Sequence, residues 1–253
     1  MTSKKIILVL TASILYIFAL MHTAFAPVGY EVKAVYGTTP IIDGAISSGE
    51  WDDASVVAFS VTDGDCTIYV KQNGTHLHIA FSIADTTYHA NDRSLVYLDV
   101  DHNGGTTPQT DDLFLRVMRD GSLYEAIGTG TTWLGGGALA GWTGACSSTA
   151  AGFQTEYSIS YSKIGVTAGV AKTLGIMFES VDNPSSRYGW PPEYSFNEPD
   201  TWADLTSPTP YLWVPEPATL VAIAFMLAAV MAYHCVRNRK QPKIPFYNSA
   251  RYC

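Results

Sequence analysis

Five oxygen-bearing side chains in the middle of the chain have a spacing that suits a hard cation. They are Asp99, Asp101, Asn103, Asp111 and Asp112. Oxygen ligands at alternate positions of a loop suit Ca²⁺, and Gly104 allows the chain to turn back around an ion. The twelfth position of the run is Thr110 instead of an EF-hand glutamate, so one of the later aspartates must supply that carboxylate. The sequence predicts a calcium site here; a solvated acidic turn is the alternative.

Aromatic side chains in two stretches rich in Gly, Thr and Pro form a second group of candidates. Their flat rings can stack on the apolar C–H faces of sugars, which predicts a ligand-binding role. The candidates are Trp133, Trp142, Trp190 and Tyr188. The alternative is that these rings pack beneath their own loops. Trp51 and Trp202 fall at positions that we predict to be core.

Histidines offer a third chemistry. His76 and His78 are two residues apart on a predicted strand and would share one face, with His89 and His102 nearby in sequence. A metal site needs a third convergent ligand, so surface histidines are the simpler interpretation. The sequence contains no serine-centred elbow, zinc-helix motif or phosphate loop, and we predict no catalytic activity.

The charge balance excludes one class of partner. Between Val35 and Trp213 seven Lys or Arg stand against twenty-one Asp or Glu, a net charge of −14. Such a domain repels phosphate backbones, so we expect no nucleic-acid binding, and it attracts divalent cations.

The elements that must position these residues are predicted to be short strands with alternating apolar side chains. We expect strands at 56–61, 66–71, 75–84, 95–101, 113–119, 123–127, 153–161 and 173–181. Asn73-Gly74 and Asp120-Gly121 are typical hairpin turns. Residues 128–151 and 182–201 are predicted loops. The pattern indicates an all-β fold, an antiparallel β-sandwich.

Both ends of the chain have the character of targeting segments. Lys4 and Lys5 precede the apolar run Ile6–Leu20, and the small-residue site Ala24-Phe25-Ala26 follows. We therefore predict a signal peptide within residues 1–34, with an uncleaved signal anchor as the alternative. Export would permit a disulfide between Cys66 and Cys146, although two free thiols are equally compatible with the sequence.

Near the C-terminus, Val214-Pro215-Glu216-Pro217 precedes nineteen residues without Asp, Glu, Lys or Arg (218–236) and the basic cluster Arg237-Asn238-Arg239-Lys240. As a helix this run measures about 28 Å, enough to cross a bilayer. The order of parts in 214–240 resembles a PEP-CTERM sorting signal. The resemblance implies processing by an exosortase-type enzyme and display at the cell surface; a plain membrane anchor is the alternative. The basic cluster predicts that 241–253 is a cytoplasmic tail and that the acidic domain lies outside.

Short motifs across the domain resemble family 9 carbohydrate-binding modules and their DOMON-like relatives. They are Ile42-Asp43-Gly44, Glu50-Trp51 with Ala54, Ile83-Ala84-Asp85, the strand 96–101, Asp111-Asp112, and Glu156 with Ile159; Ser160 stands where the family has proline. The match spans about Ile41 to Leu205. It implies a jelly-roll or DOMON-like sandwich whose sugar is clamped by two tryptophans.

We therefore predict an exported, surface-anchored, non-catalytic domain at 35–213 that binds carbohydrate or glycan and is stabilised by Ca²⁺. A structural or adhesive envelope protein is the first alternative. Some DOMON relatives hold haem through Met or His, and Met118 and Met177 lie on predicted strands. A haem-binding electron-transfer module is therefore the second alternative.

Overall fold

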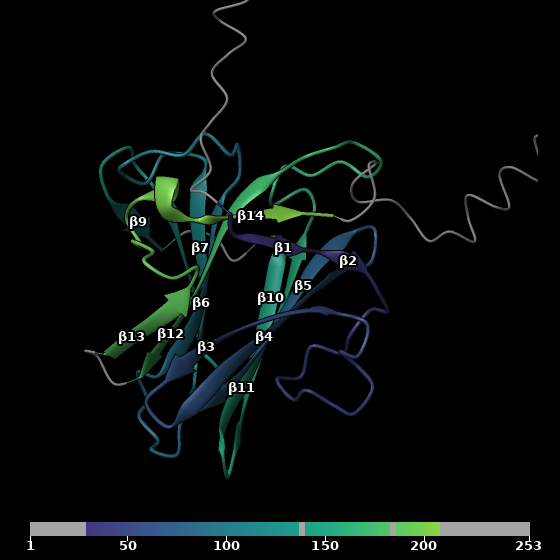
Figure 1. The fold of residues 1–253 in the computed structure, drawn as a ribbon, viewed down its shortest axis with the longest axis vertical. Helices are drawn as coiled ribbons and strands as arrows, with labels where there is room; N and C mark the ends of the chain where they lie inside the picture. The colour runs from purple at the N-terminus through teal and green to yellow at the C-terminus, as the bar shows by residue number, and fades with distance from the viewer. Residues whose placement is uncertain (1–28, 137–139, 183–185, 208–253) are drawn as a thin grey trace, which may run out of the picture. The chain divides into compact units, whose positions relative to one another are not determined.

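The computed structural model describes residues 29–136, 140–182 and 186–207, and within them fourteen strands form two sheets (Figure 1). The eight-stranded sheet consists of β1 (Glu31–Lys33), β14 (Ala203–Thr206), β12 (Leu174–Asp182), β6 (Arg93–Asp99), β7 (Asp112–Met118), β8 (Leu123–Gly128) and β9 (Trp133–Gly135), in this spatial order, with β13 (Ser186–Trp190) on β12. The six-stranded sheet consists of β10 (Trp142–Thr149), β11 (Gly152–Ser160), β5 (His76–Ala84), β4 (Gly64–Gln72) and β2 (Val35–Tyr36), with β3 (Ser55–Val61) on β4.

The main core fills the space between the two sheets. Alternation along β5 sends Leu77, Ile79, Phe81 and Ile83 into it, as the sequence predicts, and each is at most 3% exposed. A fully buried side chain of this size contributes about 1.5–3 kcal/mol to folding. The fold is thus an all-β sandwich, and the predicted fold class is confirmed at this level.

A second apolar cluster lies on the other side of the eight-stranded sheet. We call it the outer aromatic cluster; its buried members are Leu95, Tyr97, Met177, Val181 and Trp202, and its half-buried members are Phe114, Trp133, Tyr194 and Phe196. Residues 191–202 run over this side of the sheet and contribute three of the rings. As a result β6 and β12 are buried on both faces and have nearly continuous apolar sequences.

All eight strands predicted from alternation are present, with ends displaced by at most two residues. The two predicted loops are corrected, because β9 and β10 lie within 128–151 and β13 within 182–201. β10 has the sequence Trp-Thr-Gly-Ala-Cys-Ser-Ser-Thr, without apolar alternation, because it is an edge strand that pairs only with β11.

The sequence left open whether Cys66 and Cys146 form a disulfide or stay as two thiols, and in the structure both are free. Cys66 lies on β4 and Cys146 on β10, and β5 and β11 separate these strands. Three strand spacings of about 4.8 Å place the Cα atoms about 14 Å apart, whereas a disulfide needs less than about 7 Å.

The signal peptide (1–34, apart from its last six residues), the sorting motif Val214-Pro215-Glu216-Pro217, the apolar run and the tail lie outside the described residues. Within the described part of the chain no helix is long and apolar enough to span a membrane.

Candidate functional site

Three of the predicted calcium ligands converge where β6 ends and β7 begins. Asp99 and Asp112 are paired in register, and the connection between the strands brings Asp111 beside them. One carboxylate oxygen of each residue lies within 4.8 Å of the other two. Calcium–oxygen distances are about 2.3–2.6 Å, so oxygens on opposite sides of one ion are about 4.6–5.2 Å apart. The spacing therefore fits a shared cation.

The other two predicted ligands support this group from outside it. The Asp101 backbone N–H donates to Asp111 Oδ2 at 3.1 Å, while the Asp101 side chain is exposed. The Asn103 amide nitrogen lies 3.4 Å from both Asp111 carboxylate oxygens. The backbone N–H groups of Asn103 and Gly104 donate to the Asp99 carboxylate at 3.2 and 2.8 Å.

Asp112 is the most deeply buried carboxylate of this group. It is fully buried; Oδ2 accepts a hydrogen bond from the Gln109 backbone N–H at 2.6 Å, and Oδ1 has no partner. Burial raises the pKa of Asp112 to about 7, and the charges of Asp99 and Asp111 act in the same direction. A hollow of about 260 Å³ adjoins the group; it is lined by Val100, Thr110, Asp111, Asp112, Leu113, Ile127 and Lys163.

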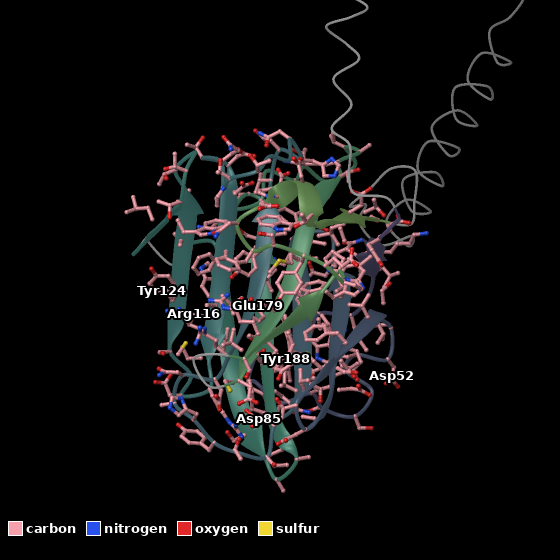
Figure 2. All side chains as sticks on the ribbon, turned by 60° about the vertical axis from the view of Figure 1, so that its left-hand side comes forward. Asp52, Asp85, Arg116, Tyr124, Glu179 and Tyr188 are labelled. Atoms are coloured by element: carbon pink, nitrogen blue, oxygen red, sulfur yellow. The ribbon has the colours of Figure 1, made fainter. Side chains whose placement is uncertain are left out.

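The outer face of the eight-stranded sheet is the second candidate, and Figure 2 labels three of its residues, Arg116, Tyr124 and Glu179. We call it the outer face; its polar and aromatic side chains are Arg93, Tyr97, Phe114, Arg116, Tyr124, Trp133, Glu179 and Arg187. Strand register brings them together, since Leu95 of β6 stands between Arg116 of β7 and Glu179 of β12.

Trp133 places a large ring on this face. Its ring packs edge-on against Phe114 at 5.1 Å and Tyr97 at 5.8 Å, and lies parallel to the buried Trp202 at 6.4 Å. Nε1 of Trp133 donates to Asn197 Oδ1 at 3.1 Å. The ring is half-buried, so one part is fixed by packing and another part is available to a ligand.

Glu179 connects the polar groups of the face. The carboxylate is fully buried and accepts from Tyr97 Oη at 3.0 Å, Tyr194 Oη at 3.4 Å and Arg187 Nη1 at 2.9 and 3.0 Å. Burial raises the pKa of Glu179, and the Arg187 charge opposes that rise. These bonds hold the groups in defined positions before any ligand arrives.

Arg116 and Tyr124 form a stacked pair beside the aromatic rings. The Arg116 guanidinium lies 4.1 Å from the centroid of the Tyr124 ring. Tyr124 lies across Gly135 of β9, where a Cβ atom would stand 1.3 Å from the phenolic oxygen. Glycine at this position therefore leaves the space that the tyrosine occupies.

The other predicted ligand-binding aromatics lie on strands and not in loops, and they do not join Trp133. Trp142 is 7% exposed in the main core, stacks on Tyr157 and donates from Nε1 to Glu125 Oε2 at 2.8 Å. Trp190 stacks on Phe178 and packs against the same core. Tyr188 Oη hydrogen-bonds Thr62 Oγ1 at 2.6 Å. Trp51 and Trp202 are buried, as predicted.

Several residues that carry the family resemblance hold the N-terminal segment against β11 through hydrogen bonds. The buried Glu156 carboxylate accepts hydrogen bonds from the backbone N–H groups of Asp43 and Gly44 at 3.0 and 2.8 Å and from Trp51 Nε1 at 2.9 Å. Gly44 has φ +89°, and a Cβ there would lie 2.4 Å from the Cys146 backbone. These motif residues therefore fasten the N-terminal segment to β11.

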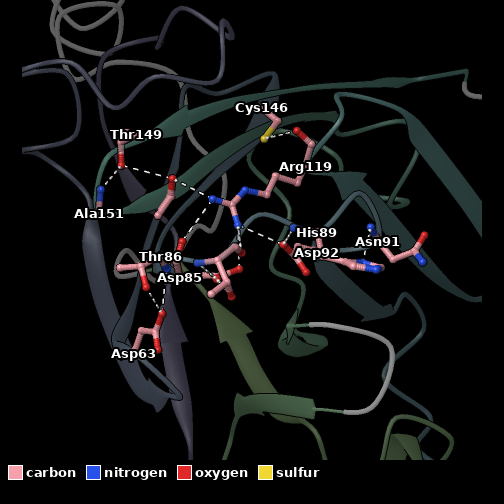
Figure 3. Close-up of polar contacts among 12 residues, drawn as sticks. Asp63, Asp85, Thr86, His89, Asn91, Asp92, Arg119, Cys146, Thr149 and Ala151 are labelled. Carbon is pink, nitrogen blue, oxygen red and sulfur yellow. Dashed lines mark hydrogen bonds and ion pairs between the residues drawn. The ribbon is translucent and has the colours of Figure 1, made fainter.

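A second group of carboxylates has an arginine paired with two of its three members (Figure 3). Asp85, Asp92 and Asp182 place oxygens within 4.8 Å of one another. Arg119 Nη1 lies 2.9 Å from Asp85 Oδ2 and 3.0 Å from Asp92 Oδ2, and also donates to the Thr87 carbonyl. The guanidinium already supplies a cation here, so we interpret this cluster as a structural ion-pair network.

The histidines do not form a metal site among the described residues, where the groups of three convergent ligands consist of aspartates alone. His78 is buried and neither ring nitrogen has a hydrogen-bond partner. Burial lowers the pKa of His78 to about 3, so the ring is neutral, and it stacks on His76 at 6.0 Å.

Comparison with known proteins places the fold. No family model matches the sequence, and a search of curated proteins gave no match. The structure resembles a family 9 carbohydrate-binding module from Caldicellulosiruptor kristjanssonii in complex with cellotriose, with TM-score 0.55 and 14% identity over 69% of this chain and 92% of that one. It also resembles a family 9 module from the same organism in complex with glucose. Here the TM-score is 0.54 and the sequence identity is 16%, over 71% of this chain and 97% of that one. The sandwich is therefore of the same general fold.

Proposed function

We propose that the sandwich is a non-catalytic carbohydrate-binding module whose ligand lies on the outer face. The observation that carries the proposal is the half-buried Trp133 ring beside Phe114, Tyr97 and the prearranged Glu179 and Arg187 side chains. Rings of this kind stack on the C–H face of a sugar, and fixed donors and acceptors bind its hydroxyl groups. The family 9 modules of the same fold, with cellotriose and with glucose, support this ligand class.

The test is a glycan screen of the full-length chain and of Trp133→Ala. We expect the variant to lose roughly 10-fold or more in affinity, since truncating an aromatic residue at the centre of a binding site commonly costs about 2 kcal/mol or more. Tyr88→Ala is the matched control, because Tyr88 is 62% exposed in the connection between β5 and β6. Wild-type protein that binds no glycan, or glycan binding that Trp133→Ala leaves unchanged, contradicts the proposal.

We also propose that Asp99, Asp111 and Asp112 hold a Ca²⁺ ion that stabilises the β6–β7 connection. The donor set is all oxygen, and the unpartnered Asp112 Oδ1 supplies a free ligand atom. Calcium at a hundred times its dissociation constant would add about 2.7 kcal/mol, or about 5–10 °C in melting temperature. A melting temperature that is the same in calcium and in EDTA contradicts this part.

The targeting segments support a further proposal, that the domain is exported and held at the cell surface. Residues 1–34 have the layout of a signal peptide, and 214–240 that of a sorting signal. Intact mass of the mature protein tests both: loss of the N-terminal segment supports export, and loss of the residues after Pro217 supports exosortase-type processing over a plain anchor. A mature protein that retains the N-terminal segment and fractionates with the cytosol contradicts the proposal.

A further inference from the structure

The outer face concentrates positive charge within a strongly acidic domain. The sequence has four arginines between residues 29 and 207, and three of them belong to the outer face. Arg93 and Arg187 pair in register with Val181 of the outer aromatic cluster, and Arg116 pairs with Leu95 of the same cluster. The fourth arginine is the one neutralised by the buried carboxylates of Figure 3.

Two of these three guanidinium groups lack an ion-paired carboxylate in the described part of the chain. Among the described residues Arg187 forms an ion pair with Glu179, and neither Arg93 nor Arg116 forms one. Arg93 Nη1 donates to the Asn91 carbonyl oxygen at 2.7 Å. Nε of Arg116 is buried without a hydrogen-bond partner. The face therefore offers unused charged donors.

Electrostatics shows that the three groups act on one another. Burial lowers the pKa of Arg93, the nearby charges of Arg116 and Arg187 lower it further, and the charge of Glu179 opposes this decrease in part. Like charges held together in a partly buried site oppose folding, and a bound anion would reverse that effect. Binding of uncharged hydroxyl groups alone does not require three guanidinium groups so close to one another.

We propose that the outer face binds an acidic sugar, with its anionic substituent held by Arg93 and Arg116 and its ring on Trp133 or Tyr124. This inference rests on the proposed carbohydrate-binding function and narrows its ligand class. Guanidinium groups match carboxylate and sulfate oxygens with two parallel hydrogen bonds, which suits a uronic acid or a sulfated sugar. The net charge of −14 over residues 35–213 disfavours nucleic acids as the anion.

The test uses matched ligand pairs that differ only in charge. Calorimetry on the full-length chain compares an oligogalacturonate with its carboxyl-reduced form, and a sulfated oligosaccharide with its desulfated form. We expect the acidic member of at least one pair to bind roughly 10- to 100-fold more tightly, because hydrogen bonds to charged groups are worth about 1.5–3 kcal/mol. A preference in one pair only identifies the substituent as carboxylate or sulfate.

Variants assign the effect to these residues. Arg116→Gln and Arg93→Gln should reduce that preference by roughly 10-fold or more, because each removes a charged donor to the anionic substituent. Arg116→Lys keeps the charge but lacks the planar guanidinium group. Its preference for the acidic ligand should therefore lie between those of the wild type and Arg116→Gln. Lys33→Gln on β1, 52% exposed, is the control for net charge. Equal binding of the acidic and neutral ligands overturns this inference and leaves the proposed function standing. Failure to bind any ligand overturns both.

Discussion

At the scale of single residues, Asp112 combines two requirements that conflict in the absence of a cation. Its burial favours the protonated carboxyl, whereas a calcium site requires the carboxylate. The pKa of Asp112 is raised from 3.8 to about 7. Between about pH 4 and pH 7 the carboxyl is therefore protonated in the native state and ionised in the unfolded state. Without calcium the free energy of unfolding should therefore fall as the pH rises from about 4 to 7.

We predict that Asp112→Asn removes this pH dependence and the response to calcium together. At pH 8 in EDTA the variant should be more stable than the wild type by about 1–3 kcal/mol, since an amide carries no charge to bury. Denaturant unfolding at pH 5 and pH 8, with calcium and with EDTA, measures both effects. Asp52→Asn at an exposed position is the control. A variant less stable than the wild type under all four conditions contradicts the prediction.

Glu156 gives a second prediction at this scale. Glu156→Gln should destabilise the fold by about 2–4 kcal/mol, because the new amide NH₂ faces N–H donors at one of the two former acceptor positions. Urea unfolding measures the change, and the exposed Glu193→Gln is the control. If the two variants are equally stable, the hydrogen bonds to the Glu156 carboxylate contribute little to folding.

At the scale of elements, the outer face depends on two strands that are buried on both sides. β6 and β12 carry apolar residues toward the main core and a mixed set toward residues 191–202. The short β9 strand matters because Gly135 makes room for Tyr124, on which Arg116 stacks. The proposed ligand site is thus built on strands, and residues 191–202 lie beside it.

Gly135→Ala tests that arrangement. The added methyl group would force the Tyr124 ring to move and would unstack Arg116, so glycan affinity should fall about 3- to 10-fold, while the melting temperature changes by only a few degrees. Leu134→Ala on the same strand is the matched control, because the Leu134 side chain is 68% exposed. Calorimetry and thermal unfolding of both variants provide the measurement. Equal affinity in the two variants would show that Tyr124 is not part of the site.

The sequence was sufficient to predict the strands whose apolar residues alternate, and these strands make up most of both sheets. It was insufficient for edge strands such as β10, where Gly and Ser flank Trp142 and resemble a loop. The candidate site was found in part: the aspartates and Trp133 have recognisable signals of type and spacing. Arg93 was missed because the two faces of β6 are both buried, so that alternation does not tell them apart. Arg116 on β7 was missed because its neighbours on the sheet are set by strand pairing and not by the local sequence. Alternation with Leu113 and Leu115 was the one signal that placed Arg116 outward.

At the scale of the whole molecule, stability comes from packing of the two sheets and not from a covalent cross-link between Cys66 and Cys146. Burial strongly raises the pKa of the Cys66 thiol and raises that of Cys146 to about 11. Both thiols are therefore protonated at neutral pH and react slowly in the folded state.

We predict that a reducing agent leaves the melting temperature unchanged. Alkylation at pH 8 followed by peptide mass analysis should label Cys66 and Cys146 fully in denaturant, without prior reduction, and only slowly in the native protein. The thiols of the unfolded chain serve as the internal reference for reactivity. A peptide pair linked through Cys66 and Cys146 would contradict the structure.

The pairing of β1 with β14 has a mechanical consequence. The two strands are parallel, with Glu31 opposite Asp204 and Lys33 opposite Thr206, and they lie side by side in Figure 1. A pull applied at residues 29 and 207 in opposite directions acts along the strands and loads their hydrogen bonds simultaneously, so they resist in shear instead of opening one after another. A domain held at residue 207 and pulled from residue 29 would therefore resist first through these hydrogen bonds, loaded together.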